Sequence, residues 1–519
     1  MMGGGALGLM AAMRPHFYRQ LLFCDSPPAL AALPPSPSKT TTARQQQQPE
    51  TKSWLLVRMF RALLNGVLKA IRTFQLLVIF LPPLMTSPVL FLSSDDWYHH
   101  WWRQMLVLSL QTAGPAFQKL GQWASTRPDL FGLATRRDLE HFHSSVPPEP
   151  WKDTLQTLRD NGFEDDFVDP LPIGAGCIAQ VHLARFKGEQ VAVKIRRRNV
   201  KFEIDRDMEL FCFVASTIER LLPVLKFLAI EEISQNVSEF LRSQLDLSVE
   251  GKNLSRFNEI FSSGPCKDEV AFPQPLYASP TLLIETLETG TLLSALLSLD
   301  DKLPTKLRKE LGRVGVQTFL EMVIVHNFIH SDLHPGNILV KTKQPIDFDR
   351  LHEVELDRMV FIDAGLVTTL APQDQINFVA LFTAVAEGDG EKAAYLMIDR
   401  SRDPSSCRDR EGFAKGMKEI VDQVALDSFR LDKVQIGSVL EKVMVLVHRH
   451  QVRMEPNFAS IVVSIIVLEG VGRQLDPELD IFKTSIPMLM RADRMYQKAA
   501  FTAAVEVAKG AKRRSSVQV

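Results

Sequence analysis

The sequence predicts an α+β chain in which a small lobe rich in β-strands is followed by a large helical lobe. Residues 171–184 form two apolar runs around a turn of small residues, and residues 190–195 form a third run, a pattern typical of three neighbouring strands. From about residue 291 most segments show helical patterning instead. The chain has 519 residues, more than one hydrophobic core usually serves, so we expect two lobes with additional segments before them.

The composition is that of an ordinary globular protein. Hydrophobic residues make up 45% of the chain and the formal net charge is −1, so no global field favours nucleic acid, which is not expected as a partner. The five cysteines form no C-x-x-C pair, which argues against a zinc site and a disulfide framework and fits a reducing compartment: Cys24, Cys177, Cys212, Cys266 and Cys407.

Residues 1–52 do not resemble a folded domain. Arg14 and Arg19 are basic, and no acidic residue precedes Asp25. An acid-poor, basic start is typical of a mitochondrial presequence, whereas a secretory signal would place its charge before its apolar core. We therefore predict a mitochondrial transit peptide. The alternative is a disordered tail that carries no address.

Residues 53–94 are predicted to associate with a membrane. Residues 73–94 carry no charge, and a spanning helix needs about 20 residues. Pro82, Pro83 and Pro88 fall inside this run and predict that a long regular helix is interrupted there. Two interpretations stay open, a single span and an apolar segment that packs on the protein or dips into the interface. The side of the membrane that the lobes face is also left open.

Residues 95–165 are predicted to form a helical extension. Aromatic residues near its start, such as Trp97 and Trp101, fit either a membrane interface or core packing. The run Lys119-Leu120-Gly121-Gln122 follows on a predicted helix. By spacing alone, Lys119 and Gln122 are ordinary surface residues.

Residues 166–290 are predicted to form the small lobe and to bind a nucleotide. Small residues let backbone N–H groups approach a phosphate, and Lys194 on the third strand can neutralise its charge. The small-residue turn alone is weak evidence, but the run Val191-Ala192-Val193-Lys194 behind it has kinase-like spacing. The residues expected to meet the nucleotide here are Ile173, Gly174, Ala175, Gly176, Cys177, Ile178, Ala179, Gln180, Val181 and Lys194.

Two helices are predicted next, over residues 199–220 and 230–261. Kinases need an acidic residue on a helix to hold the strand lysine in place. Glu250 is predicted for this role, with Glu239 as the alternative. The competing interpretation is a surface glutamate on an amphipathic helix.

Residues 281–290 are predicted to form a strand and a glycine turn that leave the small lobe. In a kinase this segment is the hinge, and its backbone meets the adenine. Glu285 and Leu287 are therefore expected to contact the nucleotide.

Residues 328–340 carry the strongest functional signal. Asp332 and Asn337 share one turn, and Asp363 follows a later apolar run and precedes a glycine. Kinases use such an Asp and Asn in one loop, and a second Asp before a glycine, to hold Mg²⁺ and orient a phosphate. We predict Asp332 and Lys194 as catalytic residues, with Asp332 as base or orienter, and Asn337 and Asp363 as metal ligands.

The two histidines of the same loop, His330 and His334, are alternative metal ligands. Their surroundings offer oxygen donors, and Mg²⁺ avoids imidazole. A structural role for both is the favoured interpretation.

The remaining sequence, residues 291–508, is predicted to form the helical lobe, followed by a basic tail at 509–519. A strongly apolar helix at 307–327 leads into the loop just described. The later helices are predicted at 373–387, 391–400, 412–426, 434–450, 458–475 and 487–508.

Over about residues 110–495 these motifs resemble the UbiB family, also called aarF-domain-containing atypical kinases. The run at 119–122 matches its hallmark Lys-x-Gly-Gln, which ordinary protein kinases lack. The other matching segments are the nucleotide loop at 172–184, Lys194, the Glu-x-Asp region at 244–253, the catalytic motif at 330–337, the metal motif at 363–365 and the C-terminal helical signature at 456–477.

The resemblance implies a protein-kinase-like two-lobe fold that uses ATP and Mg²⁺. It places Lys119 and Gln122 on a helix that covers the cleft, where a protein substrate would dock, and sets Asp246 opposite that helix. It also implies a lipid or quinone-like small molecule, the mitochondrial inner membrane and coenzyme Q biosynthetic proteins as partners.

Two departures from the family pattern bear on function. The family's nucleotide loop is rich in alanine, whereas Gly174 and Gly176 stand here, which favours the nucleotide handling of ordinary kinases. Gln244 stands where the family has a glutamate, which leaves Asp246 to keep the contact with Lys119.

Three functions are weighed. The first is an ATPase or a small-molecule or lipid kinase that supports mitochondrial coenzyme Q biosynthesis and lipid and fatty-acid metabolism. The second is a genuine Ser/Thr protein kinase, which the two loop glycines favour. The third is a nucleotide-sensing membrane scaffold without phosphotransfer. Lys194, Asp332, Asn337 and Asp363 are all present, which argues against an inert scaffold.

Overall fold

The computed structural model describes residues 52–92, 95–125, 133–139, 146–163, 168–222, 230–299, 303–344, 354–401, 403–428 and 436–452, and between 461 and 488 only single residues and short runs. The chain divides into two compact units, 1–64 and 65–519. The described part of the first unit is the start of one helix. The predicted transit peptide, apart from residue 52, and the basic tail lie outside the described residues.

Helix α2 (Lys52–Thr86) continues through Pro82 and Pro83, so the predicted interruption is wrong at these two prolines. A proline frees the carbonyl four residues before it. Pro83 frees that of Ile79, which accepts a hydrogen bond from Ser109 Oγ at 3.1 Å. A helix beside α2 thus satisfies the carbonyl that the proline leaves unpaired. The chain turns into a short 3₁₀ helix, η2 (Ser87–Phe91), only at Pro88.

One stretch of the described chain, Gly66–Leu90, is long and apolar enough to cross a membrane. Part of it also packs on the protein. Leu76, Ile79 and Phe80 contact a core of buried apolar residues, and the Phe80 and Phe117 rings lie 5.2 Å apart.

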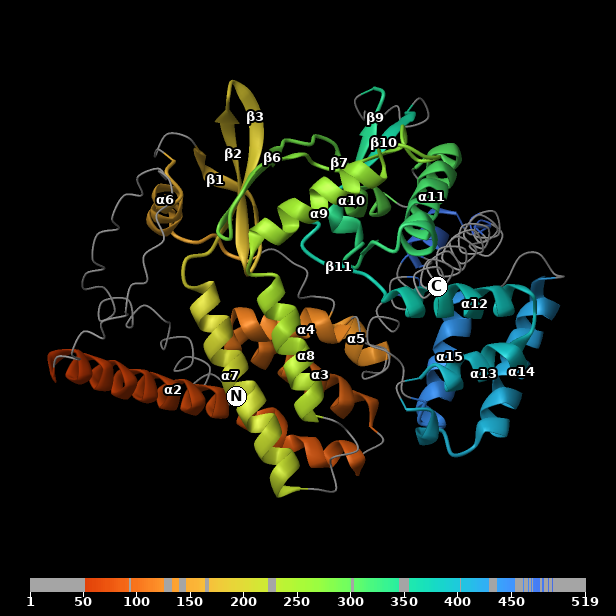
Figure 1. Cartoon of the computed structure of the whole chain (residues 1–519), viewed down its shortest axis with the longest axis horizontal. Coiled ribbons are helices and arrows are strands. Elements are labelled where there is room, and N and C mark those ends of the chain that lie inside the picture. Colours follow the sequence, from red (N-terminus) through yellow and green to blue (C-terminus); the bar gives the residue numbers. More distant parts are fainter. Residues whose placement is uncertain are drawn as a thin grey trace, which may run out of the picture. The chain divides into compact units, whose positions relative to one another are not determined.

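That core belongs to a group of helices beside the strands (Figure 1). Neighbouring helices of this group contact one another along the series α3–α4–α7–α8. A shorter helix, α5, contacts α3 and α4. Their bounds are α3 (Asp96–Ala113), α4 (Pro115–Ser125), α5 (Leu133–Leu139), α7 (Val200–Leu221) and α8 (Ile230–Ser243).

The predicted strands form a five-stranded antiparallel sheet in the order β1-β2-β3-β6-β5. Its alternating side chains separate two faces. One face, with Val193 and Ile284, packs against helix α6 (Trp151–Asp160) through Leu158. The other face carries Lys194 and is approached by helix α9 (Leu247–Ile260). The strands are β1 (Val168–Ala175), β2 (Ala179–Phe186), β3 (Glu189–Arg196), β5 (Pro275–Ala278) and β6 (Leu282–Thr286).

The single helix predicted over 230–261 is wrong, because α8 ends at Ser243 and α9 begins at Leu247. Asp246 between them has extended backbone, and its side chain accepts a hydrogen bond from the Ser248 N–H at 2.9 Å. Such N-capping starts a new helix. Because of this break, the direction of α9 toward the sheet does not depend on the direction of α8.

A second sheet has four strands in the order β4-β10-β9-β7. Strands β4 and β7 come before the predicted catalytic loop in the sequence, and β9 and β10 come after it. Helix α11 (Thr305–Leu320) ends in a π-helical turn, η6 (Glu321–Val325), and leads into this loop. The strands are β4 (Val270–Ala271), β7 (Thr291–Leu292), β9 (Ile338–Thr342) and β10 (Leu356–Phe361), with helix α10 (Leu293–Leu297) after β7 and a separate pair, β8 (Ile329–His330) and β11 (Val367–Thr368).

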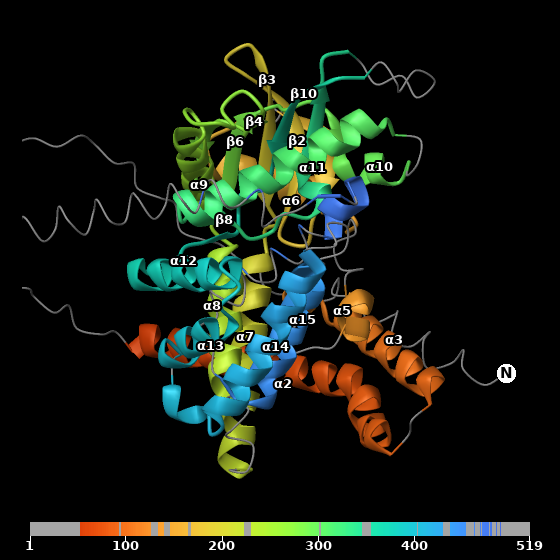
Figure 2. The same ribbon diagram turned by 90° about the vertical axis from the view of Figure 1, so that its right-hand side faces the viewer.

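Four later helices agree with the predicted positions to within about two residues. They are α12 (Pro372–Ala386), α13 (Gly390–Asp399), α14 (Arg410–Ser428) and α15 (Ile436–Arg449). They share a core of their own, and Figure 2 shows α13, α14 and α15 side by side. Of the predicted helix at 458–475 only some residues are described, and of the helix at 487–508 only Met488. The predicted α+β class is confirmed.

Candidate functional site

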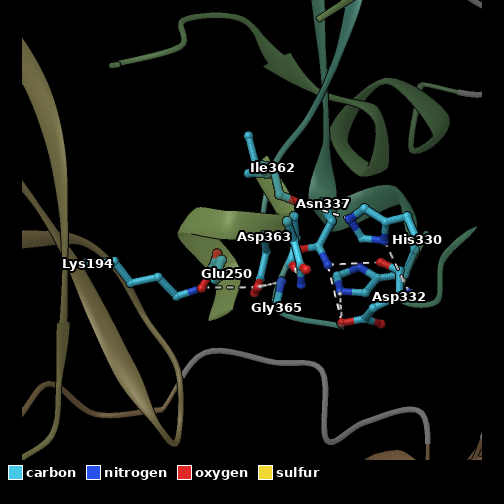
Figure 3. Close-up of polar contacts among 11 residues, drawn as sticks. Lys194, Glu250, His330, Asp332, Asn337, Ile362, Asp363 and Gly365 are labelled. Atoms are coloured by element: carbon cyan, nitrogen blue, oxygen red, sulfur yellow. Dashed lines mark hydrogen bonds and ion pairs between the residues drawn. The ribbon is translucent and has the colours of Figure 1, made fainter. Parts of the chain in front are cut away.

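The predicted lysine, helix glutamate and metal aspartate come together in the structure (Figure 3). Lys194 Nζ on β3 lies 2.9 Å from Glu250 Oε1 on α9 and 3.0 Å from Asp363 Oδ1. Lys194 and Glu250 are 56 positions apart, and Lys194 and Asp363 are 169 apart. One ammonium group therefore joins the strand, the helix and the loop after β10.

A glycine allows α9 to carry Glu250 this close to the sheet. A Cβ on Gly251 would lie 2.8 Å from the Ala278 Cβ and 3.3 Å from Leu283 Cδ1. The first distance is shorter than real Cβ contacts, so a side chain at 251 would push α9 off strands β5 and β6. Glu250, the residue before it, is 3% exposed and holds its carboxylate under Lys194.

Asp363 is held in a strained backbone conformation. Its φ is +60°, in the left-handed region that few residues other than glycine adopt. Strain of this kind persists where the surroundings enforce it, often at functional sites. Here Asn253 Nδ2 donates to the Ala364 carbonyl at 2.9 Å and ties the loop to α9. Asn253 was not predicted as a site residue, although it lies one helical turn after Glu250.

Hydrogen bonds between its own residues hold the predicted catalytic loop together. Asn337 Nδ2 donates to the Asp332 carbonyl at 3.0 Å and to Asp332 Oδ2 at 3.3 Å. The Asn337 carbonyl accepts from the Ile362 N–H at 2.9 Å, which connects this loop to the segment that carries Asp363. Hydrogen bonds thus connect Asp332 to Asn337, and Asn337 to the residue before Asp363 (Figure 3).

The two histidines of this loop hold the backbone. His334 Nδ1 accepts from the Gly336 N–H at 3.0 Å, and the fully buried His330 uses Nδ1 to accept from the Asp332 N–H at 3.3 Å. Burial lowers the pKa of His330. Both rings already fix the turn that presents Asp332, in line with the structural role favoured from the sequence.

The pKa values of Lys194, Asp363 and Glu250 shift in different directions because the three groups are buried together. Burial lowers the pKa of Lys194, but the carboxylates of Asp363 and Glu250 outweigh burial and raise it above the ordinary lysine value. Burial also opposes ionisation of Asp363, yet Lys194 and Lys119 hold its pKa well below the usual range. Burial, partly offset by Lys194, raises the pKa of Glu250 to about 7. Asp363 is therefore the carboxylate that stays charged across the neutral range.

The Lys-x-Gly-Gln run lies on α4, and its lysine acts electrostatically on Asp363, the predicted metal ligand. The positive charge of Lys119 is one of the causes that lower the pKa of Asp363. The structure does not pair Lys119 with Asp246, because Asp246 caps α9 and faces Arg196 instead. Gln122 follows on the same helix.

The predicted nucleotide loop contributes less side-chain surface than expected. Cys177, Ile178 and Ala179 are buried in the core of the helical group, and Gln180 Nε2 donates to Thr154 Oγ1 at 2.7 Å. Their side chains are therefore occupied, which leaves the backbone to face a ligand. Residues 173–176 and Val181 are partly or fully exposed.

An arginine that was not predicted supports this loop. Arg197 Nε donates to the Gly176 carbonyl at 2.8 Å. Gly174 and Gly176 have no left-handed backbone, and a Cβ would meet nothing within 4 Å at Gly174 and one carbonyl at 3.4 Å at Gly176. The fold therefore does not require glycine at these positions, and alanine fits both.

The predicted hinge contains a close backbone approach. A Cβ on Gly290 would lie 2.9 Å from the Val340 carbonyl oxygen, so glycine is needed where the segment passes β9. Glu288 is paired with Lys341 at 2.5 Å. Leu287 is half-buried, and Glu285 is 9% exposed on β6.

Glu285 is expected to make folding stability depend on pH. Burial, reinforced by the charge of Glu250, raises the pKa of Glu285 from 4.5 to about 8. The folded chain keeps this proton where the unfolded chain releases it, so the free energy of unfolding should fall as pH rises through that window. Glu285→Gln should flatten part of this decrease in denaturant unfolding between about pH 5.5 and 8.5. Equal slopes in both proteins would contradict the assignment.

The donor set fits magnesium held together with a nucleotide. Within the described ranges no group of three or more His, Cys, Asp or Glu side chains could hold a metal. Asn337 donates through its nitrogen to Asp332, which leaves the amide oxygen as its ligand atom, and Asp363 supplies a charged carboxylate. Mg²⁺ usually takes one or two protein oxygens and completes its shell with phosphate and water.

Two family models match this chain. An ABC1 atypical kinase-like domain matches residues 142–397, and a UbiB helical domain matches residues 419–480. A mitochondrial ABC1 family protein of Saccharomyces cerevisiae is 33% identical over 496 aligned residues, which cover 82% of this chain and 75% of that protein. The chain belongs to the ABC1/UbiB family of atypical kinase-like proteins. The predicted family and the kinase-like fold are thereby confirmed.

Other relatives carry kinase names. A probable serine/threonine-protein kinase of Dictyostelium discoideum is 31% identical over 83% of this chain and 70% of its own length. A probable protein kinase UbiB of Azotobacter vinelandii is 29% identical over 76% of this chain and 72% of its own length. A Mycobacterium tuberculosis protein solved in complex with erythromycin matches at 19% identity and a TM-score of 0.45, over 70% of this chain and 89% of its own.

Proposed function

We propose that this chain binds Mg-ATP and acts as an ATPase or as a kinase of a small, lipid-like molecule. The observation that carries the proposal is the Lys194–Glu250–Asp363 cluster, with contacts of 2.9 and 3.0 Å. The protein-kinase template joins a strand lysine to a helix glutamate and sets a metal-binding aspartate beside the phosphates.

The roles follow from charge and position. Lys194, held by Glu250, would meet the α/β phosphates of the nucleotide, and Asn337 and Asp363 would hold Mg²⁺, which neutralises phosphate charge. Asp332 Oδ2 is already oriented by Asn337 at 3.3 Å. From there it would orient an attacking hydroxyl or water and accept its proton.

The Lys-x-Gly-Gln helix supports a restricted substrate. Lys119 on α4 is close enough to Asp363 to affect its pKa, so this helix reaches the cleft. A long peptide would compete with α4 for that space. A small molecule, such as a quinone-like lipid, needs less of it.

The proposed cellular role is support of coenzyme Q biosynthesis and lipid metabolism at the mitochondrial inner membrane. Relatives named mitochondrial and UbiB support it. Helix α2 would bring the chain to the membrane, because its outward face exposes a row of apolar side chains: Phe74, Leu77, Leu81, Leu84 and Met85. Whether α2 spans the bilayer or lies in its surface, and which side the lobes face, stay open, and coenzyme Q biosynthetic proteins are proposed partners.

A Ser/Thr protein kinase is the second candidate. The glycines at 174 and 176 favour it, as does the kinase name of the Dictyostelium relative. Because alanine fits both positions sterically, the glycines are not needed for the fold and are free to serve nucleotide handling.

The test is ATP turnover by the purified chain, alone, with vesicles and with a short-chain quinone in vesicles, in parallel with a peptide library. We expect turnover that rises with the lipid and no peptide phosphorylation. Phosphorylation of peptides in trans with Lys119 and Gln122 intact would contradict the restricted-substrate proposal. Absence of turnover under every condition would contradict catalysis.

A further inference from the structure

A fourth acidic side chain, Glu285, faces the candidate nucleotide site. In the register of the five-stranded sheet Glu285 lies opposite Ala192, and Leu283 lies opposite Lys194. Residues directly opposite point to the same face, and so do residues two apart along a strand. Glu285 therefore shares the face of Lys194, displaced along the sheet by about 7 Å toward the hinge.

Within the part of the chain that the structure describes, Glu285 is the acid of this cluster without a hydrogen-bond or ion-pair partner. Glu250 and Asp363 share Lys194, and Glu288 pairs with Lys341 at 2.5 Å. Glu285 is 91% buried, since its exposed fraction is 9%, and among the described residues its Oε2 has no hydrogen-bond partner. The strand register turns its side chain to the face of Lys194 and away from the apolar core of Val193 and Ile284 on the other face.

An unpaired buried carboxyl is costly to the folded chain. Moving a polar group out of water without a hydrogen bond is unfavourable, and an apolar residue of similar size avoids that cost. Leu282 and Ile284, the neighbours of Glu285 in β6 on the other face, are both fully buried apolar residues. A ligand that completes the hydrogen bond would explain why an acid stands on the cleft face.

The position of Glu285 along the sheet indicates which part of a bound nucleotide it would contact. A nucleotide whose phosphates lie at Lys194 and Asp363 must extend its base along the sheet toward the hinge, which is the direction of Glu285. We propose that Glu285 is a specificity-determining residue whose carboxyl oxygen accepts a hydrogen bond from the exocyclic amino group of the bound adenine. This inference rests on the proposed nucleotide function. It adds a side-chain contact to the backbone contacts expected of the hinge.

The experiment compares two ligands that differ in one group. ATP carries the 6-amino group, and purine riboside triphosphate carries hydrogen in its place. Their Mg²⁺-dependent affinities are measured by calorimetry on the full chain, for the parent, Glu285→Leu and Glu285→Gln. Glu288→Gln, an acid of the same segment that has its own partner, serves as the matched control.

The parent and Glu288→Gln should prefer ATP by about tenfold, the usual worth of a buried hydrogen bond to a charged or strongly polar group. Glu285→Leu should bind both ligands equally, through loss of ATP affinity alone. Glu285→Gln should keep the preference, because its amide oxygen still accepts.

An unchanged ATP preference in Glu285→Leu would overturn the inference while the nucleotide function stands. If neither ligand binds the parent, the nucleotide function itself fails. Thermal melting provides a fold control, and Glu285→Leu should melt at or above the parent. A lower melting temperature would show that the carboxyl has a structural partner, which would also overturn the inference.

Discussion

Asp363→Asn is expected to lower Mg²⁺-dependent ATP binding and turnover by at least about a hundredfold, because the carboxylate proposed to bind the metal is lost. The substitution keeps the size of the side chain but removes the charge that Lys194 and Lys119 stabilise. The amide also leaves Lys194 with Glu250 as its remaining acidic contact. The effect should therefore appear in both the metal requirement and the nucleotide affinity.

Asp357→Asn is the matched control, since Asp357 lies on β10, the strand that leads to Asp363, and its carboxylate is exposed beside Arg358. We expect it to bind Mg-ATP like the parent. If Asp363→Asn binds Mg-ATP as tightly as the parent does, the metal assignment is wrong.

Arg72→Leu is expected to destabilise the chain by about 2 kcal/mol, because the buried Asp207 loses its two hydrogen bonds to Arg72 and keeps the contact with Arg206 at 3.0 Å. Asp207 on α7 is 1% exposed and accepts from Arg72 Nε at 2.9 Å and from Arg72 Nη2 at 2.7 Å. Arg72 Nη2 also donates to the Ala113 carbonyl at 2.5 Å. Helix α2 is thus fastened to α3 and α7 by one guanidinium group.

The nearby ion pair Lys69–Glu209 also joins α2 to α7, but each of its two side chains is about half exposed. Lys69→Leu should therefore cost no more than about 1 kcal/mol. Both variants are compared by denaturant unfolding followed by tryptophan fluorescence, since Trp102 Nε1 contacts the Pro83 carbonyl of α2. Equal losses would contradict the account of α2 as part of the fold.

Local signals in the sequence predicted much of the site. The strand around Lys194, the turn that carries Asp332 and Asn337, and the aspartate before a glycine depend on neighbouring residues, and each lies where the sequence placed it. The Lys194–Glu250 contact was predicted from the chemical need for an acid on a helix, and the ion pair is present.

Most of the features that the sequence did not predict depend on distant partners. Helix α2 continues through Pro82 and Pro83, and Ser109, 30 positions after Ile79, donates a hydrogen bond to the Ile79 carbonyl that Pro83 leaves free. Arg72 and Asp207 are 135 positions apart. The position of the Glu285 carboxyl on the Lys194 face depends on the register of β6 against β3, which joins residues about 90 positions apart. The break before α9 is the exception, because it follows from a local signal, the N-capping Asp246.

The central claim is that Lys194, Asn337 and Asp363 form a magnesium–nucleotide site. Its most direct test is a calorimetric titration of the purified full chain with ATP, once with excess Mg²⁺ and once with EDTA. We predict saturable binding at one site with Mg²⁺ and binding at least about tenfold weaker without it. Binding of equal strength in both titrations, or none in either, would contradict the claim.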